Sequence, residues 1–167
     1  HVNYNGPSSD DMERMCKHLA KDFNCKIYLK NVIIKKNENF ESAARKIRYD
    51  FFQNIIKDNS LDYILTAHHN LDQIETLYMK YQDNSDWISM IGIREKRNNI
   101  IRPILNIKKK QIDKYMENNK IKFIYDISND NLFIRRNHIR KTIIPRLLKK
   151  NPTLIKKLLS NSNLYNR

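Results

Sequence analysis

Hydrophobic and polar positions follow two different spacings along the first half of the chain. Apolar residues recur at helical spacing in residues 8–19, 39–56 and 71–81, and this spacing predicts three helices. Between them, residues 25–34 and 61–67 are rich in β-branched and aromatic residues and predict strands. Strands that alternate with helices are typical of an α/β fold, so we expect a mainly parallel sheet with flanking helices.

The pattern changes after a polar turn at residues 83–86. From there on the predicted elements are mostly helical, and they comprise a strand end at residues 100–103, a polar turn at residues 126–131, and helices at residues 108–119, 136–144 and 152–159. Pro145 and Pro152 are expected to separate the last two helices, because proline lacks the N–H that a helix interior needs.

Charge divides the chain more sharply than hydrophobicity does. The sequence carries 32 Lys and Arg against 18 Asp and Glu, a net charge of +14. Residues 1–93 have a net charge of −1, and residues 94–167 have a net charge of +15. A codon bias toward lysine would raise lysine everywhere, so its concentration in one half favours a surface that meets a polyanion. A membrane-surface patch fits less well, because the basic half lacks a clean amphipathic helix.

Composition excludes several classes of protein. No apolar run approaches the ~18 residues of a membrane-spanning helix, so we expect no membrane partner. The two cysteines, Cys16 and Cys25, fit no CxxC metal or redox motif and indicate a reducing compartment. With only 2 glycines, these residues cannot form a glycine-rich phosphate loop.

The densest polar cluster follows the strand predicted at residues 61–67 and opens the next helix. Asp72 and Glu75 share one face of that helix, and His68 and His69 stand directly before it. Ligands of open α/β sheets bind at this edge, where two carboxylates can hold a divalent cation or accept a proton from an amine. The alternative is a helix start with capping acids and two ordinary histidines, but the whole cluster at this location favours function.

Two further clusters give weaker signals. Arg45 and Arg48 share a helix face with Glu41, which alone would be a solvated ion pair worth about a few tenths of a kcal/mol. The turn at residues 126–131 precedes basic residues at 135–141, whose guanidinium forks match phosphate oxygens. An Asx turn before an ordinary basic helix would give the same pattern, so the residues alone leave both interpretations open.

Taken together, these clusters resemble the tRNA(Ile)-lysidine synthase family, PP-loop ATP pyrophosphatases with an adenine-nucleotide α-hydrolase-like fold. The family pattern HHxDDQxET is similar to residues 68–76, and ExxAR…RY is matched within residues 41–49. The RP segment is matched by residues 102–103, and DxSN…RNxIR…P is matched within residues 126–145. Four motifs in the family's order span nearly the whole chain, so the resemblance is specific.

The resemblance implies a ligase that attaches free L-lysine to C2 of the wobble cytidine of tRNA(Ile) with the anticodon CAU. ATP would adenylate the cytidine, and the lysine amine would then displace AMP. The implied cofactors are ATP and Mg²⁺, the partners are tRNA(Ile) and lysine, and a homodimer is one option. Residues 1–93 would be the nucleotide-binding part, and residues 94–167 a continuation with a small basic helical subdomain facing tRNA. Bacterial cytoplasm and an organelle interior both fit.

The resemblance also implies roles for individual residues. The expected catalytic residues, which would meet lysine, Mg²⁺, the cytidine or the adenylate, are Asp72, Glu75, Arg48 and Arg140. The expected nucleotide-binding residues are His68 and His69. The residues expected to bind tRNA, chiefly through its phosphates, are Arg135, Arg136, Asn137 and Lys141. Arg45 is expected to be structural instead.

The sequence departs from the family pattern at several places. The family's SGGxDS loop, whose backbone amides cradle phosphates, would precede His1. Leu71 stands where the pattern has its first Asp, residues 83–86 replace RGSG, and Asn131 replaces Asp. These departures keep two alternatives open: a non-catalytic tRNA-binding remnant, and another PP-loop enzyme such as a tRNA thiolase, which usually needs cysteines at its site.

Overall fold

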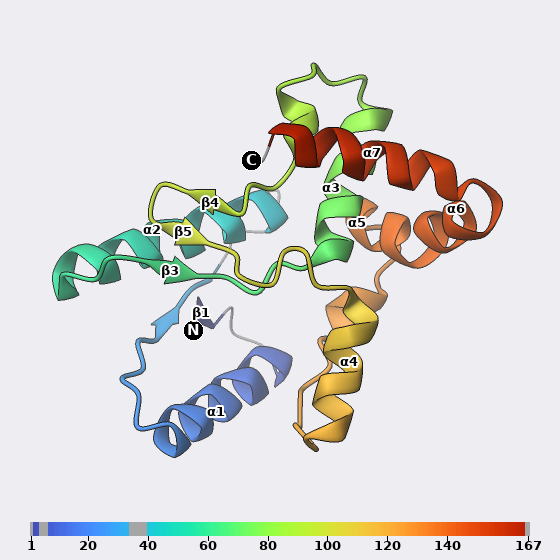
Figure 1. Cartoon of the computed structure of the whole chain (residues 1–167). Helices are drawn as coiled ribbons and strands as arrows, with labels where there is room; N and C mark the ends of the chain where they lie inside the picture. Colours follow the sequence, from blue (N-terminus) through green and yellow to red (C-terminus); the bar gives the residue numbers. More distant parts are fainter. Residues whose placement is uncertain (1, 4–6, 34–39, 166–167) are drawn as a thin grey trace. The chain divides into compact units, whose positions relative to one another are not determined.

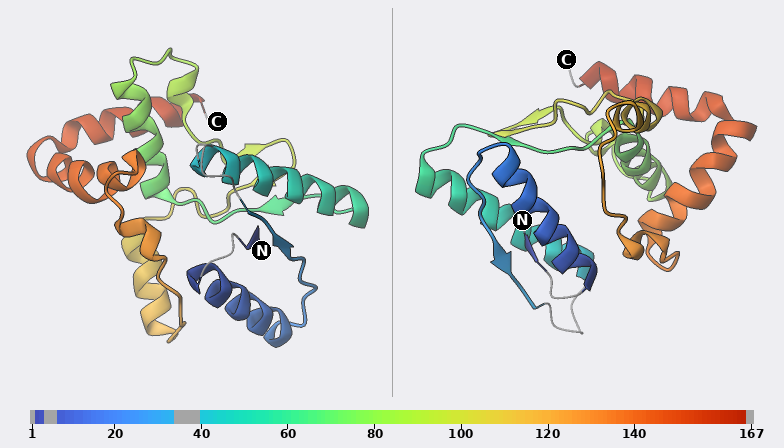
Figure 2. Two further views of the ribbon diagram at one scale, coloured as in Figure 1. Left: turned by 180° about the vertical axis from the view of Figure 1, so that it is seen from behind. Right: turned by 90° about the horizontal axis from the view of Figure 1, so that it is seen from below.

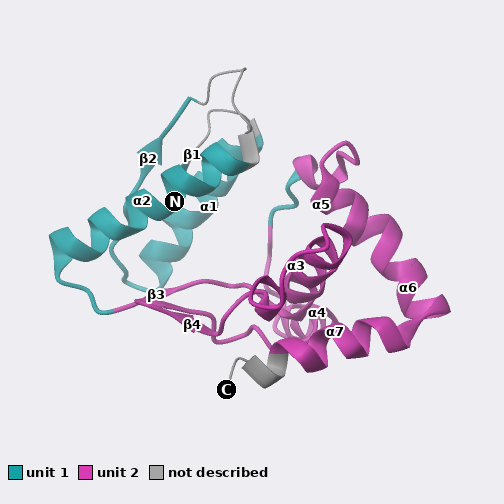
Figure 3. Cartoon of the chain, turned by 90° about the horizontal axis from the view of Figure 1, so that it is seen from above, with its two compact units in different colours: residues 1–62, 124–126 teal, residues 63–123, 127–167 magenta. Residues whose placement is uncertain are grey.

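The computed structural model describes residues 2–3, 7–33 and 40–165 (Figure 1). The chain divides into two compact units (Figure 3). Unit 1 comprises residues 1–62 and 124–126, and unit 2 comprises residues 63–123 and 127–167. Within the described ranges, no helix is long and apolar enough to cross a membrane.

Unit 1 pairs two short parallel strands and carries two long helices. Its elements are β1 (Val2–Asn3), α1 (Pro7–Asp22), β2 (Lys30–Asn31) and α2 (Phe40–Asn59). In the parallel pair, Val2 lies opposite Lys30. The two helices confirm the predicted helices, but the strand predicted at residues 25–34 is paired only at β2. Ile27 and Leu29 are exposed in that segment, so these two apolar side chains are not packed into the described part of unit 1.

The sheet of unit 2 is small and mixed. It contains β3 (Ile64–Leu65), β4 (Lys96–Arg97) and β5 (Ile100–Ile101) in the order β3-β5-β4. β3 runs parallel to β5, whereas β4 and β5 form an antiparallel hairpin. Among the described strands, an extended parallel sheet with flanking helices is therefore not confirmed, although β1 with β2 and β3 with β5 are parallel pairs.

Helices make up most of unit 2. They are α3 (Asn70–Gln82), the 3₁₀ turn η1 (Ser89–Ile91), α4 (Lys109–Asn118), the 3₁₀ turn η2 (Ile127–Asp130), α5 (Arg135–His138), the π-helical turn η3 (Ile139–Ile143), α6 (Ile144–Lys150) and α7 (Pro152–Tyr165). The predicted helix end at residue 144 is wrong, because the chain stays helical through η3 into α6. Pro145 lies in the first turn of α6, where its missing N–H does no harm, and the wide turn η3 precedes it.

The core of unit 2 lies among α3, η3, α6 and α7. Its buried residues are Ile74, Ile139, Ile144 and Ile155, each from a different element. Each buried isoleucine contributes roughly 1.5–3 kcal/mol of hydrophobic stabilisation. Helices α3 and α7 pack against each other, as the views of Figure 2 also show. This packing fixes the helix that bears the densest polar cluster of the sequence.

Candidate functional site

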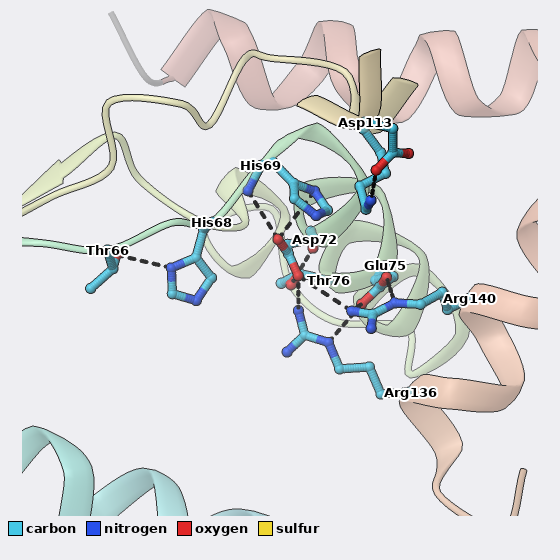
Figure 4. Close-up of polar contacts among 10 residues, drawn as sticks. Thr66, His68, His69, Asp72, Glu75, Thr76, Asp113, Arg136 and Arg140 are labelled. Carbon is cyan, nitrogen blue, oxygen red and sulfur yellow. Dashed lines mark hydrogen bonds and ion pairs between the residues drawn. The ribbon is translucent and has the colours of Figure 1, made fainter. Parts of the chain in front are cut away.

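The chain leaves β3 and turns into α3 over residues 66–69, three of which carry polar side chains. The Thr66 hydroxyl lies 3.0 Å from Nδ1 of His68 (Figure 4). The backbone of Thr66 continues the pairing with β5, since its N–H donates to the Ile101 carbonyl at 3.0 Å. The site predicted at the carboxyl end of this strand is therefore built on paired backbone, which holds His68 and the start of α3.

Asp72 caps the first turn of α3. Its Oδ2 accepts a hydrogen bond from the backbone N–H of His69 at 2.9 Å, and Nδ1 of His69 lies 3.3 Å from the same oxygen. A carboxylate here also interacts favourably with the positive end of the helix dipole. The sequence left helix capping and function as alternatives for this cluster. Asp72 is the capping residue, and it is also one of the expected catalytic residues.

Glu75 lies one turn later and is fully buried, with both carboxylate oxygens occupied. Arg136 Nε donates to Oε2 at 2.7 Å, and Arg140 donates through Nε to Oε1 at 2.5 Å and through Nη2 to Oε2 at 3.0 Å. A buried carboxylate needs such charged partners, because an unpaired charge in the interior is strongly unfavourable. Glu75 therefore holds Arg136 and Arg140, which belong to α5 and η3, against α3.

The same arginines also reach Asp72, but only loosely. Nη2 of Arg136 and Nη2 of Arg140 each lie 3.4 Å from Oδ1 of Asp72. The side chains of Asp72, Arg136 and Arg140 keep exposed fractions of 14%, 22% and 29%, whereas that of Glu75 has 0%. Two carboxylates and two guanidinium groups thus form one cluster, which we call the ionic cluster (Figure 4). Within it, Asp72 is the carboxylate that an approaching amine can meet.

Arg135 points to the other end of α3. Its Nη1 and Nη2 lie 3.2 and 2.6 Å from the carboxylate of Asp83, the residue that ends the helix. The hydrogen bond from Arg135 holds the pKa of Asp83 below its usual value, and Asp83 raises the pKa of Arg135 in return. Asp83 is the first residue of the segment that replaces RGSG, so this departure gives Arg135 an internal partner.

The other two residues expected to bind tRNA are also engaged within the chain. The buried Asn137 amide donates to the carbonyls of Ser128 and Asn131 at 2.9 and 3.0 Å and thereby holds the turn before α5. Lys141 forms an ion pair with Asp130. Their predicted roles on tRNA remain predictions.

Arg48 and Arg45 lie on α2, in unit 1. The guanidinium carbon of Arg45 lies 4.8 Å from the ring centroid of Tyr49, a cation–π contact one turn along the helix. Arg48 is exposed on the same helix. Its expected approach to the cytidine remains a prediction.

A network of uncharged groups joins α3 to residues 91–93 and to α7, and the sequence did not predict it. The buried Gln73 amide donates to the Ile91 and Ile93 carbonyls at 3.3 and 3.2 Å and to the Ser162 hydroxyl at 2.6 Å, and it accepts from Ile93 N–H at 2.7 Å. Ser162 donates in turn to the Ile91 carbonyl at 2.6 Å. Gly92 has φ +73, and a Cβ there would lie 2.8 Å from Oε1 of Gln73. Gly92 is one of only 2 glycines in the chain, and it was the only feature of the sequence that pointed to this network.

Leu71 and Arg102 are motif residues that lie outside the ionic cluster, and both have structural contacts. Leu71, which stands where the pattern has an acid, packs against the core of unit 2. Arg102 is buried, and its Nη1 donates to the Arg94 carbonyl at 2.7 Å. Across the described parts of the chain, no group of three or more His, Cys, Asp or Glu could hold a metal ion. The cysteines of unit 1 are unbridged.

The PP-loop domain matches residues 4–147 of the chain. The chain belongs to the PP-loop domain family. It is 36% identical over 97% of its length to the tRNA(Ile)-lysidine synthase of Persephonella marina. The corresponding enzymes of Campylobacter jejuni and Mycoplasma mycoides are 36% and 34% identical over 84% and 96% of the chain. The resemblance drawn from the motifs is confirmed.

The PP-loop domain implies the adenine-nucleotide α-hydrolase-like fold, so the expected fold is confirmed at the level of the family. The chain spans 37%, 45% and 44% of the lengths of these three curated relatives.

Proposed function

We propose that the protein carrying this chain is a tRNA(Ile)-lysidine synthase, which uses ATP to ligate lysine to C2 of the wobble cytidine of tRNA(Ile). The name carried by several relatives and the match to the PP-loop domain support this proposal. The geometric support is the ionic cluster, where α3 presents Asp72 and Glu75 beside Arg136 and Arg140. The decisive observation is the unequal engagement of its two carboxylates.

Asp72 is suited to act on lysine, and Glu75 is suited to position the arginines. The reaction needs an amine that has lost a proton, so a carboxylate must lie where an ammonium group can reach it. Asp72 keeps some exposure, and its contacts with the guanidinium groups are long, at 3.4 Å. Glu75 has no exposure and both its oxygens are occupied. We therefore assign proton acceptance to Asp72 and assign Glu75 to positioning.

Arg140 and Arg136 supply positive charge beside Asp72. Adenylation of the cytidine releases pyrophosphate, and attack by the lysine amine on C2 then breaks the bond to the AMP oxygen. Both steps develop negative charge on phosphate, which fixed guanidinium groups stabilise. Glu75 holds both guanidinium groups in place, so they need little reorganisation when the charge develops. We propose that Arg48 faces the same cytidine.

The two histidines and Mg²⁺ are assigned to the binding of ATP. We propose that His68, held by Thr66, contacts the nucleotide, with His69 beside it. The carboxylates of the ionic cluster do not fit a Mg²⁺ site, because both already lie against guanidinium groups. We propose instead that Mg²⁺ enters with the phosphates of ATP and is not bound by Asp72 or Glu75.

The remaining expectations are proposals about the whole protein. They are a full parallel sheet with flanking helices, the division near residues 93 and 94, free L-lysine as the second substrate, a homodimer, and a location in bacterial cytoplasm or an organelle. A cytidine in an anticodon loop must be splayed from its neighbours to meet the ionic cluster, which suits recognition of single-stranded RNA.

The experiment is the substitution Asp72→Asn in the full-length protein, with Asp113→Asn as the matched control. Asp113 is an exposed carboxylate of α4 paired with Lys109, so its loss removes the same charge without touching the ionic cluster. We expect Asp72→Asn to lower kcat for transfer of labelled lysine to a tRNA(Ile) transcript by about 10²–10⁴-fold, the usual effect of a general base. Unchanged transfer by Asp72→Asn would contradict the assignment.

A further inference from the structure

The cations predicted to bind tRNA phosphates are largely matched by carboxylates of the same chain. Arg135 pairs with Asp83, Arg136 with Glu75, and Lys141 with Asp130. A guanidinium or ammonium group that is already paired gains less from a phosphate, because the existing partner must first be displaced. The excess charge of the second half must therefore reach RNA mainly through other residues.

The helical hairpin of α6 and α7 carries positive charge without any carboxylate in its own sequence. Residues 131–167 contain 10 Lys and Arg and no Asp or Glu. Five exposed cations lie on these two helices, and we call them the α6–α7 basic surface: Arg146, Lys149, Lys150, Lys156 and Lys157. Within the described part of the chain, none of the five forms an ion pair.

The fold directs these cations outward and holds the helices that bear them. Helices α6 and α7 pack on each other, and the single residue Asn151 joins them at a tight corner (Figure 1). The Asn151 side chain caps α7 by accepting the Leu154 N–H at 3.2 Å. Ile144 and Ile155 are buried on the inner side, so the cations of both helices are left on the solvent side of a fixed scaffold.

Helix α4 shows what a basic helix looks like when its charge is balanced locally. Its sequence carries Asp113 and Glu117 among its lysines, and Lys109 pairs with Asp113. Codon bias alone would mix carboxylates into α6 and α7 as it does into α4. Their absence over 37 residues sets the hairpin apart.

We propose that the α6–α7 basic surface binds the phosphate backbone of RNA. This inference rests on the proposed function, since it names the part of the chain that contacts the tRNA substrate. Lysine ammonium groups act on phosphates as point charges, so this surface supplies affinity and orientation, without reading bases. The paired arginines near α3 are thereby left to the chemistry, and the hairpin holds the RNA.

The test compares two variants of the full-length protein that lose equal charge. One carries Lys149→Gln, Lys150→Gln, Lys156→Gln and Lys157→Gln, and the control carries Lys108→Gln, Lys110→Gln, Lys114→Gln and Lys120→Gln. All eight lysines are exposed. Binding of tRNA(Ile) is measured by filter binding between about 50 and 200 mM salt, the range over which phosphate contacts change affinity most visibly. Thermal unfolding verifies that both variants are folded.

We expect the hairpin variant to lose about 0.7–0.9 in the slope of log K against log salt for each phosphate contact removed, and to bind at least about tenfold more weakly. Its KM for tRNA should rise, while kcat at saturating tRNA stays near that of the unsubstituted protein. The control should change both quantities much less.

Two results would overturn the inference. The first is a hairpin variant with an unchanged salt slope, and the second is a control that loses as much as the hairpin variant does. Failure of the proposed function looks different: the unsubstituted protein then binds tRNA with the expected salt slope but transfers no lysine. An unsubstituted protein that binds no RNA at all would overturn both.

Discussion

Helix α3 takes part in two polar networks of opposite character. Through Asp72 and Glu75 it meets two guanidinium groups, so the contacts within the ionic cluster join formal charges. Through Gln73, on the intervening position, it meets the backbone of residues 91–93 and the hydroxyl of Ser162, and every partner is neutral. The ionic cluster retains partly exposed side chains, whereas Gln73 and Ser162 are buried.

The two networks together show how one helix can be held in place and still present a partly exposed carboxylate. The neutral network uses its donors and acceptors within the protein, so it anchors α3 to α7 without leaving a group for a ligand. The two arginines contact Glu75 closely but lie 3.4 Å from Oδ1 of Asp72. Anchoring through Gln73 holds the position of the helix, although the arginines contact the adjacent Asp72 only loosely.

The largest expected effect on stability is that of Glu75→Ala. The substitution leaves Arg136 and Arg140 close together without their main counter-charge, which costs about 3 kcal/mol for a buried pair. Urea unfolding of the full-length protein measures this as a lower midpoint with an unchanged slope. If Glu75→Ala unfolds at the same urea concentration as the unsubstituted protein, the cluster does not hold α3 to the helices that bear the arginines.

A smaller loss is expected for Gln73→Leu, about 2 kcal/mol, because the partly buried N–H of Ile93 and two carbonyls lose their partner. The matched control is Gln82→Leu on the exposed end of the same helix, where the amide makes only a 3.4 Å contact with Tyr78. Equal midpoints for the two variants in urea unfolding would show that the neutral network does not anchor α3.

The smallest effect is expected at the ion pair of Asp83 and Arg135, whose side chains are about half exposed. The pKa of Asp83 lies below the usual 3.8 because Arg135 donates to its carboxylate. Its contribution to stability is therefore present above pH 3.8 and is lost as the pH falls through the lowered value. An NMR titration of the carboxyl carbon should show this pKa rising toward the usual value in Arg135→Gln. A pKa that does not move in this variant would mean that the pair does not persist in solution.

Local pattern predicted much of the helical framework from the sequence. Helices α2, α3, α4 and α7 lie where the apolar spacing placed them, because each buries one face along its length. The end of the helix near Pro145 was misplaced, since proline stops a helix interior but is accepted in a first turn. Two-residue strands carry too little pattern to fix a sheet, so its extent was not predictable.

The candidate site was predictable only as a set of residues. Asp72 and Glu75 share a helix face by spacing, but their arginine partners lie 61 to 68 residues further along the chain. Periodicity carries no information about such pairings, and it could not show that Arg136 would turn toward Glu75. Ser162 was missed for the same reason, because its partner Gln73 lies 89 residues away.

The π-helical turn η3 sets the rotational phase between two parts of one continuous helical segment. A π turn holds about one residue more than an α turn, so α6 is rotated by about 100° from the position that an uninterrupted helix would give it. Arg136 and Arg140 lie before and within this turn, and Arg146 and Lys149 lie after it. Removing one residue from η3 would make the helix regular, and the cations beyond it would then face a different direction although none had been substituted.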